Sequence, residues 1–318
     1  MDSTFVVGID IGGQTSKLGV VDANGTVLAQ TVIRTDTYTD IEPYIAELAA
    51  AVKQIIAEAG VEGKLKGIGV GAPNANYYTG TIENAVNLSW GAEKVEFSKL
   101  LSEAMGGLPV ALTNDANAAA VGEMKYGAAR GMKNFIMITL GTGVGSGIIV
   151  NGNVLYGHDG FAGELGHVAA VRNNGRTCNC GKTGCLETYA SATGVARTAR
   201  EWLELSDEPS VLRNLDKIAS KDVYEAAKAG DKLALKIFDF TGKILGRSFS
   251  DFIAFSSPEA IVLFGGLARA KEYLLEPIET AMNENVMPMW RNKVKIVFSQ
   301  LKESDAAILG ASALAWDL

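Results

Sequence analysis

One pattern occurs twice in this sequence, and it constrains the fold more than any other feature. The first copy is "FVVGIDIGGQTSKLGVVDANGTVLAQ", from residue 5, and the second is "NFIMITLGTGVGSGIIVNGNVLYG", from residue 134. Each has an apolar run, a glycine-rich turn, a second apolar run and a third short extended run. The Asn24-Gly25 and Asn151-Gly152 pairs between extended runs are hairpin signals. An internal duplication of this kind predicts two related domains.

Size and charge agree with two domains and exclude several classes of partner. A chain of 318 residues is long enough for two domains of ordinary size. Its net charge of −7 disfavours nonspecific binding to nucleic acid or to an anionic membrane. No basic segment precedes the first apolar run, and no apolar run approaches the roughly 18 residues that span a bilayer. We expect neither a signal peptide nor a membrane span, and a cytoplasmic, reducing compartment without a disulfide framework.

Helical and extended patterns alternate along the rest of the chain. The predicted helices cover residues 40–59, a stretch from about Asp115, residues 232–255 and the final segment "DAAILGASALAW". Buried strands are predicted at 65–73 and 108–113, and "PEAIVLFGGLARAKEYL" predicts a strand, a Gly-Gly turn and a helix. Alternating strands and helices predict an α/β fold. Three antiparallel strands over residues 5–34 would make the sheets mixed.

The three cysteines and one of the two histidines lie in one window, "GELGHVAAVRNNGRTCNCGKTGCLE". Thiolates and a neutral imidazole are preferred ligands of zinc, and four of them complete a tetrahedral shell. The window therefore predicts a zinc site formed by His167, Cys178, Cys180 and Cys185. A closed shell has no position for water, so the predicted Zn²⁺ is structural. The alternatives are a reduced thiol cluster or a redox pair, for which a Cys-x-Cys spacing is weak support.

The order of the motifs resembles that of the ROK family (repressors, open reading frames and sugar kinases). The motifs are "GIDIGG", "TNDANAAAVGE", "ITLGTGVGSGIIVNG", "GELGH", "CNCGKTGCLE" and "IVLFGG", and the resemblance covers almost the whole chain. It implies a duplicated actin-like (ribonuclease-H-like) two-domain sugar kinase fold with mixed sheets. We expect a small α/β domain of residues 1–113 plus 301–318, and a large one of residues 114–300 that carries the zinc-binding loop.

The resemblance also implies an activity, since most enzymes of the family phosphorylate hexoses with Mg-ATP. Phosphoryl transfer needs a cradle for phosphates, a metal ion and a group that orients and deprotonates the attacking hydroxyl. Glycine turns can bring backbone N–H groups close to phosphate oxygens. By resemblance Asp10 helps to hold Mg²⁺ through water, and Gly265 and Gly266 lie against the adenosine of ATP. The other expected nucleotide-binding residues are Gly12, Gly13, Gln14, Thr15, Lys17, Gly141, Thr142 and Gly143.

Asp115 is the candidate catalytic base. It follows a predicted strand and begins a predicted helix, where α/β sheets expose reactive groups. Local sequence alone favours a helix cap, whereas the Asn-Asp pair at this point of the family implies that Asp115 accepts the proton of the sugar hydroxyl. An imidazole can bind zinc with one nitrogen and face the sugar with the other, and carboxylates accept bonds from hydroxyl pairs. The expected sugar ligands are Asn87, Asn114, Asp115, Glu164, His167 and Glu187.

Two loops depart from the family pattern. Gln14 stands where the first phosphate turn usually has Thr, and Thr15 follows it. The loop "GAPNANYYTG", which by resemblance borders the sugar, carries Asn74 and Asn76 where family kinases often have Gly and Asp. Glucose is the expected substrate. Fructose, mannose, N-acetylglucosamine and N-acetylmannosamine stay open, because discrimination depends on a few buried polar groups.

Two other classes within the family compete with the kinase. A repressor would carry a basic helix-turn-helix before the first phosphate turn, which here starts at Asp10. A sugar-binding regulator without catalysis would not need Asp10, Asn114 and Asp115. We therefore expect an ATP-dependent sugar kinase whose partners are a hexose and Mg-ATP, without nucleic acid or membrane. A homodimer is implied by the family alone.

Overall fold

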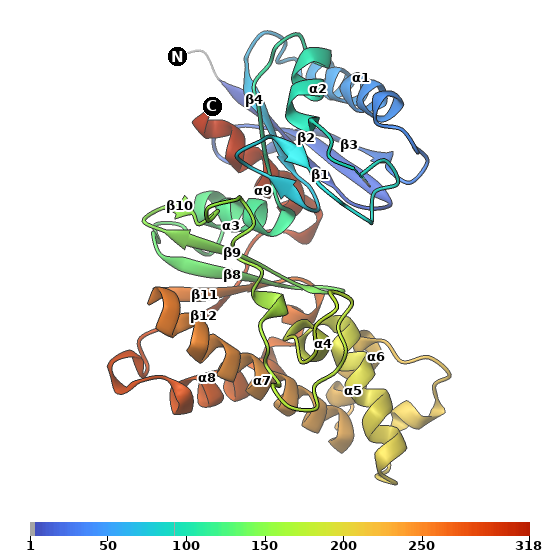
Figure 1. Cartoon of the computed structure of the whole chain (residues 1–318), viewed down its shortest axis with the longest axis vertical. Coiled ribbons are helices and arrows are strands. Elements are labelled where there is room, and N and C mark those ends of the chain that lie inside the picture. The colour runs from blue at the N-terminus through green and yellow to red at the C-terminus, as the bar shows by residue number, and fades with distance from the viewer. Residues whose placement is uncertain (1–3, 92) are drawn as a thin grey trace. The chain divides into compact units, whose positions relative to one another are not determined.

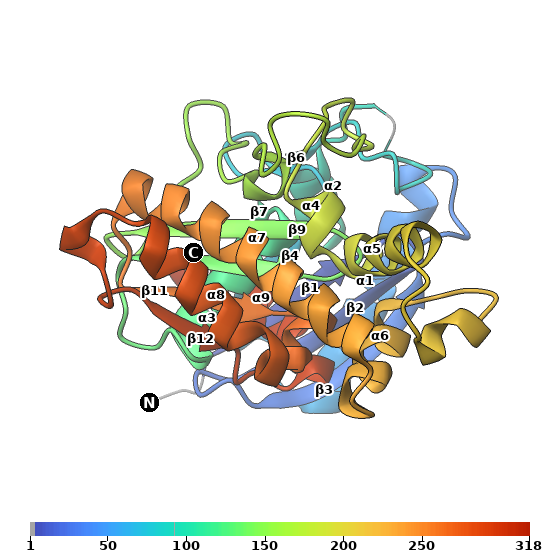
Figure 2. The ribbon, with the colours of Figure 1, turned by 90° about the horizontal axis from the view of Figure 1, so that it is seen from below.

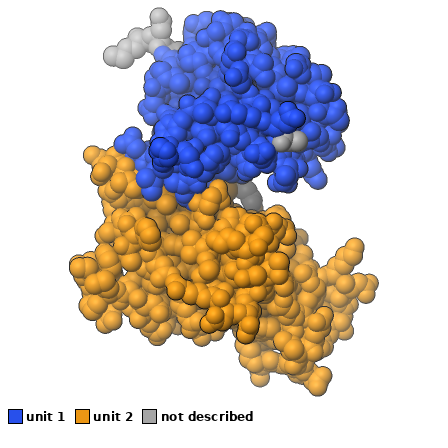
Figure 3. Space-filling view, viewed as in Figure 1, with its two compact units in different colours: residues 1–132, 153–163, 300–318 blue, residues 133–152, 164–299 orange. Residues whose placement is uncertain are grey.

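The computed structural model describes residues 4–91 and 93–318, which form two compact units (Figures 1 and 3). Unit 1 holds the described part of residues 1–132 with 153–163 and 300–318, and unit 2 holds 133–152 and 164–299. These units differ from the predicted domains chiefly over residues 114–132. The reason is that α3 (Asp115–Tyr126) packs against α9 (Glu303–Leu314) within unit 1. The predicted division into functional domains stays a prediction.

Unit 1 contains a mixed sheet in the order β3-β2-β1-β4-β7. The first three strands are antiparallel neighbours, as predicted, whereas β4 and β7 add in parallel. The parallel edge places the carboxyl ends of β1, β4 and β7 side by side, where α/β sheets present their functional groups. The strands are β1 (Phe5–Ile11), β2 (Thr15–Val21), β3 (Val27–Arg34), β4 (Leu65–Gly71) and β7 (Val110–Thr113), with the short β5 (Ala75–Asn76), β6 (Thr81–Ile82) and β10 (Asn153–Val154) outside this sheet order.

Helices cover both faces of the unit 1 sheet. α1 (Ile41–Ala59) buries Tyr44, Leu48, Val52 and Ile55 in the core and ends at Gly60 in the left-handed conformation, as the sequence predicted. α9 lies directly on β1 and β4, since a Cβ at Gly8 would be 2.1 Å from the Ile308 carbonyl oxygen. The remaining helices are α2 (Phe97–Ala104) and the 3₁₀ turn η5 (Ala315–Asp317).

Unit 2 repeats the arrangement with the strand order β9-β8-β11-β12. β8 and β9 are antiparallel, whereas β11 is parallel to both β8 and β12. The strands are β8 (Phe135–Leu140), β9 (Val144–Val150), β11 (Ala260–Phe264) and β12 (Lys295–Phe298). Mixed sheets are therefore confirmed in both halves of the duplicated pattern.

The helices of unit 2 pack into one core with its sheet. α7 (Lys232–Ser256) and α8 (Lys271–Asn285) lie side by side, and Phe238, Leu245 and Phe249 join strand residues in the core (Figures 1 and 2). The predicted Gly-Gly turn leads into the 3₁₀ helix η3 (Gly266–Ala270) before α8 begins. The other helices are η1 (Leu165–His167), α4 (Glu187–Ala190), α5 (Ala192–Leu205), η2 (Val211–Asn214), α6 (Ser220–Lys228) and η4 (Pro288–Trp290). No helix in the described ranges has the length and apolarity needed to cross a bilayer.

Candidate functional site

The first glycine turn connects β1 to β2 in unit 1. Gly12 N–H donates to the Thr15 carbonyl over 3.0 Å, and the Gln14 carbonyl accepts from Thr35 N–H at 2.9 Å. A Cβ at Gly13 would be 2.9 Å from the Asn87 carbonyl oxygen. The turn thus lies against the chain at Asn87, so the structure brings this predicted sugar ligand to the predicted phosphate residues of the same unit.

Two carboxylates lie at the carboxyl edge of the unit 1 sheet. A Cβ at Gly71 would be 3.9 Å from Asp10 Oδ1 and 3.5 Å from Asp115 Cα, so this glycine keeps the space between them open. Burial, and to a smaller extent the negative charge of Asp115, raises the pKa of Asp10 to about 6. Lys17, directly opposite Asp10 on β2, opposes this increase. A nearby cation stabilises the charged form of such a carboxylate.

Asn114 is the N-cap of α3, and Asp115 is the first residue of the helix. Asn114 has an extended backbone, and its side chain accepts a hydrogen bond from Ala116 N–H at 2.9 Å. Asp115 Oδ1 accepts from the same N–H at 2.8 Å. Desolvation of the carboxyl by surrounding protein atoms raises the pKa of Asp115, although the residue as a whole is exposed to solvent. The capping role is therefore filled by Asn114, and Asp115 is reachable from solvent.

The loop that carries Asn74 and Asn76 contacts residues 156–159 of the same unit. The Asn76 side chain donates to the Asp159 carbonyl at 2.8 Å, and the Tyr78 hydroxyl donates to the Gly157 carbonyl at 2.9 Å. Tyr77 stacks on Tyr156 with ring centroids 4.2 Å apart. These contacts fasten residues 153–163, which lead directly to Glu164. The sequence did not predict these contacts, because Asn76 and its partners are far apart in the chain.

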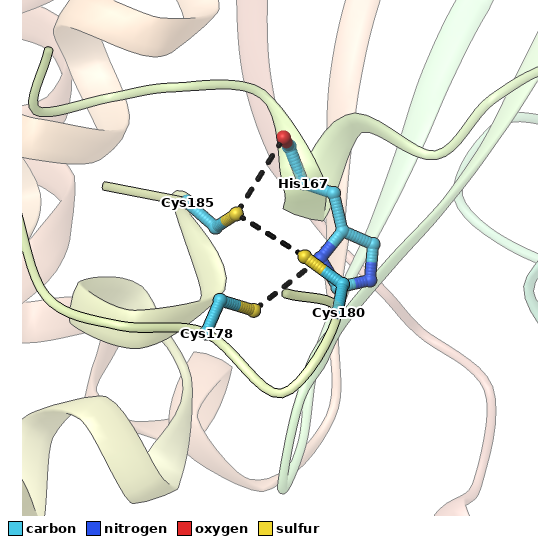
Figure 4. Close-up of side chains that lie close together, drawn as sticks. All are labelled: His167, Cys178, Cys180 and Cys185. Carbon is cyan, nitrogen blue, oxygen red and sulfur yellow. Dashed lines mark hydrogen bonds between the residues drawn. The ribbon is translucent and has the colours of Figure 1, made fainter. Parts of the chain in front are cut away.

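The predicted zinc ligands come together in unit 2 (Figure 4). Cys180 and Cys185 sulfurs are 3.6 Å apart, and Cys178 Sγ is 3.6 Å from His167 Nδ1. The four ligand atoms all lie within 4.8 Å of one another. Tetrahedral zinc with bonds of about 2.0–2.3 Å requires ligand atoms about 3.4–3.8 Å apart. The two pairs at 3.6 Å match this spacing, and the Cys₃His donor set is one that binds Zn²⁺ in a closed shell.

The loop of the predicted zinc ligands also orients His167. η1 begins after Glu164, whose carbonyl accepts from His167 N–H at 3.1 Å. Lys182 Nζ donates to the His167 carbonyl at 2.8 Å. Since Nδ1 is the ring nitrogen near the thiol, Nε2 lies on the opposite side of the ring, as a residue serving both metal and sugar would require.

Glu187 connects the metal cluster to the second glycine turn. Its Oε2 accepts from Val144 N–H at 2.9 Å, and its Oε1 lies 3.9 Å from Cys178 Sγ. The sequence identified Glu187 as a sugar ligand, but it did not predict the backbone contact. No periodic or local signal in the sequence links residues 144 and 187. The sugar role of Glu187 stays a prediction.

The predicted nucleotide residues of unit 2 meet at the carboxyl ends of β8 and β11. In the second glycine turn, Gly141 N–H donates to the Gly143 carbonyl at 3.0 Å. Gly265 has φ of 101°, and a Cβ on it would be 2.6 Å from the Leu140 carbonyl oxygen. The Gly265-Gly266 turn thus packs against the last residue of β8. Backbone N–H groups and the parallel strand ends form a typical setting for a phosphate-bearing ligand.

Comparison with known proteins gives a consistent result. Residues 6–317 match the model of the ROK family. The chain is 38% identical to a glucokinase of Halalkalibacterium halodurans over 319 residues, covering 99% of this chain and 96% of the relative. A glucokinase of Thermotoga maritima is 34% identical over 99% of this chain and 98% of its own length.

A solved structure agrees with these sequence relatives. A ROK family glucokinase from Streptomyces griseus, in complex with glucose and AMPPNP, superposes with a TM-score of 0.78 at 32% identity, covering 99% of this chain and 100% of that one. The resemblance and the duplicated actin-like α/β fold are confirmed by these matches. This chain belongs to the ROK family.

Proposed function

We propose that this protein is an ATP-dependent hexokinase that transfers the γ-phosphoryl group of ATP to the primary hydroxyl of glucose. The relatives from Halalkalibacterium halodurans and Thermotoga maritima, at 38% and 34% identity, are glucokinases, and the Streptomyces griseus relative holds glucose and an ATP analogue. The observation within this chain that carries the proposal is the pair of carboxylates, Asp10 and Asp115, that lie next to Gly71 at the carboxyl edge of the unit 1 sheet. Asp115 is exposed to solvent, so a substrate hydroxyl can reach it, and a positioned carboxylate can serve as a general base.

The predicted site residues have different roles in this chemistry. Asp115 would accept the proton of the attacking hydroxyl, and Asn114 keeps the first turn of α3 in place so that the carboxyl stays at the sheet edge. The glycine turns supply backbone N–H groups to phosphate oxygens. His167, Glu164, Asn87 and Glu187 would bind sugar hydroxyls.

Two metal ions suit the residues present. Asp10 offers a carboxylate for Mg²⁺, an ion that binds oxygen ligands and neutralises phosphate charge. Burial is the largest cause of its raised pKa, and a divalent cation beside the carboxylate would favour the charged form. The Cys₃His cluster would hold Zn²⁺ as a structural ion that fixes the orientation of His167.

The test is an ADP-release assay with Mg-ATP over glucose, mannose, fructose, N-acetylglucosamine and N-acetylmannosamine. We expect the highest kcat/KM for glucose. A clear preference for another sugar would replace glucose while retaining the kinase. Sugar binding without ADP release from any member of the panel would favour the non-catalytic regulator and contradict the proposal.

The homodimer implied by the family stays a prediction. Light scattering coupled to size exclusion measures it, and the expected mass is twice the 33.5 kDa of the chain.

A further inference from the structure

The segment from Glu187 to Thr193 contacts the second glycine turn at three successive peptide groups. Glu187 Oε2 accepts from Val144 N–H at 2.9 Å. Ala192 N–H donates to the Gly141 carbonyl at 2.8 Å, and Thr193 Oγ1 donates to the Thr142 carbonyl at 2.9 Å. All three bonds lie within unit 2. One short stretch of chain therefore holds a whole turn from one side.

These bonds fix the direction of the remaining N–H groups of the turn. A trans peptide is planar, so a carbonyl and the N–H of the next residue point in opposite directions. With the Gly141 and Thr142 carbonyls bound to the start of α5, the N–H groups of Thr142 and Gly143 point away from it. Within residues 4–91 and 93–318, the structure gives neither N–H an acceptor. Val144 N–H, by contrast, is occupied by Glu187.

We propose that Glu187, Ala192 and Thr193 are positioning residues of the second phosphate turn, which aim the Thr142 and Gly143 N–H groups at the phosphates of ATP. This inference rests on the proposed kinase function and assigns a role to two residues that the sequence did not identify. Two adjacent N–H groups aimed at one side form a concave anion site. Because the donors are aimed before the nucleotide arrives, less ordering remains to be done on binding.

The start of α5 makes this arrangement rigid. Ser191 is the helix N-cap, and its Oγ accepts from Gly194 N–H at 2.9 Å. Ala192 and Thr193 are thus the first two residues of a capped, 14-residue helix, rather than part of a mobile loop. The same segment begins shortly after Cys185, a predicted zinc ligand. The phosphate turn is therefore bonded to a segment that joins the predicted metal cluster to a capped helix.

The first test compares Thr193→Val with Thr193→Ser. Valine keeps the branched shape but removes the hydroxyl, whereas serine keeps the hydroxyl. We expect Thr193→Val to weaken AMPPNP binding about 3- to 10-fold, the usual effect of losing one hydrogen bond, and to raise KM for ATP in proportion. Thr193→Ser should stay within about 2-fold of wild type by the same scale. The KM for the sugar should not follow the KM for ATP.

The second test removes the other carbonyl contact. Ala192→Pro deletes the N–H that donates to Gly141, at the first helical position, where proline is well tolerated. The preceding Ser191 already has the extended backbone, with ψ of 169°, that proline requires. We expect a similar or larger loss of AMPPNP affinity, with zinc content and thermal midpoint close to wild type.

The outcomes separate this inference from the proposed function. If wild type neither binds AMPPNP nor transfers phosphoryl groups, the kinase proposal itself fails. If wild type binds AMPPNP and both Thr193→Val and Ala192→Pro bind it equally well, the positioning role is wrong while the kinase stands. Loss of sugar affinity in parallel with nucleotide affinity would indicate general damage to unit 2 and would also contradict the inference.

Discussion

The two glycine turns arise from the same sequence pattern, yet different neighbours hold them. The first turn is closed by its own backbone, Gly12 to Thr15, and is covered by the carbonyl of Asn87. The second has its own backbone bond, from Gly141 N–H to the Gly143 carbonyl, and is held in addition by a carboxylate, an N–H and a hydroxyl of residues 187–193. The first turn adjoins two carboxylates with raised pKa, and the second adjoins a metal cluster. The same local pattern therefore occurs in two different surroundings, which later segments of the chain provide.

The largest effect is expected at Asp115, in unit 1. Asp115→Asn keeps the size of the side chain but removes the base, so kcat should fall about 10²- to 10⁴-fold, the range of general base catalysis. AMPPNP affinity should change little, because the second turn is untouched. Steady-state kinetics and calorimetric titration measure the two quantities.

The matched control for Asp115→Asn is its neighbour. Asn114→Ser retains an efficient N-cap, so stability should change by only a few tenths of a kcal/mol. If Asp115→Asn has a normal kcat, Asp115 is not the general base, and the proposed role of unit 1 in proton transfer is wrong.

In unit 2, loss of a predicted metal ligand should have the next largest effect. A complete zinc shell of this kind is worth about 10–16 kcal/mol, so Cys180→Ser should weaken zinc binding on the order of 10²-fold or more. Because Cys185 and Glu187 are neighbours, the AMPPNP affinity should fall with zinc loss. Zinc content by mass spectrometry and AMPPNP titration are the readouts.

The exposed Asn179, between two ligands, offers the control for the metal. Asn179→Ser should retain zinc and nucleotide affinity. Should Cys180→Ser lose zinc and still bind AMPPNP as tightly as wild type, the link between the cluster and the second turn would be absent.

Adding a methyl group to each turn tests the difference directly. A Cβ at Gly143 would be 2.3 Å from Glu187 Oε2, so Gly143→Ala should displace that carboxylate and destabilise the protein by about 1–2 kcal/mol. A Cβ at Gly13 would be 2.9 Å from a backbone oxygen, which moves less readily, so Gly13→Ala should cost about 1–3 kcal/mol. Urea denaturation measures both.

Gly141 is the stability control in the second turn. A Cβ there would meet no atom within 4 Å, so Gly141→Ala should leave the urea midpoint close to wild type. Equal destabilisation by Gly141→Ala and Gly143→Ala would mean that the contact with Glu187 does not hold the turn.

The smallest effect concerns the charge on Asp10. Its folded pKa of about 6 lies above the unfolded value near 4, so the folded state binds more protons between these values. Stability should therefore fall as pH rises from 4 to 6, and the charged form is costly above pH 6. In metal-free buffer, Asp10→Asn should stabilise the protein by about 1–2 kcal/mol at pH 7, a figure reduced for partial solvent exposure, and should have no effect at pH 4.

An aspartate with the opposite shift provides the comparison for Asp10. Hydrogen bonding to Arg34 lowers the pKa of Asp36, so Asp36→Asn should not stabilise the protein at pH 7. Equal effects of the two substitutions at pH 4 and 7 would contradict the raised pKa of Asp10.

Much of this architecture was predictable from local patterns. The β1-β2-β3 meander, the end of α1 at Gly60, the strand and helix at Asp115 and the zinc quartet all follow from short-range signals. Cys178, Cys180 and Cys185 are close in sequence, so few loop conformations could keep them apart. The sequence did not predict that residues 114–132 belong to unit 1, because this depends on the packing of α3 against α9, near the end of the chain.

The sequence by itself determined the duplicated α/β pattern, the family and the chemical types available at each turn. The pattern and the chemical types follow from hydrophobic periodicity, glycine turns and ligand spacing, which act over a few residues, whereas the family follows from the resemblance of the motifs. Only the tertiary structure decided that Asn114 rather than Asp115 caps α3, that Glu187 binds Val144 N–H, and that Thr193 fixes the Thr142 carbonyl. Hydrogen bonds between distant segments require backbone directions that no local pattern specifies, and they form only when the packed sheets and helices bring those segments together.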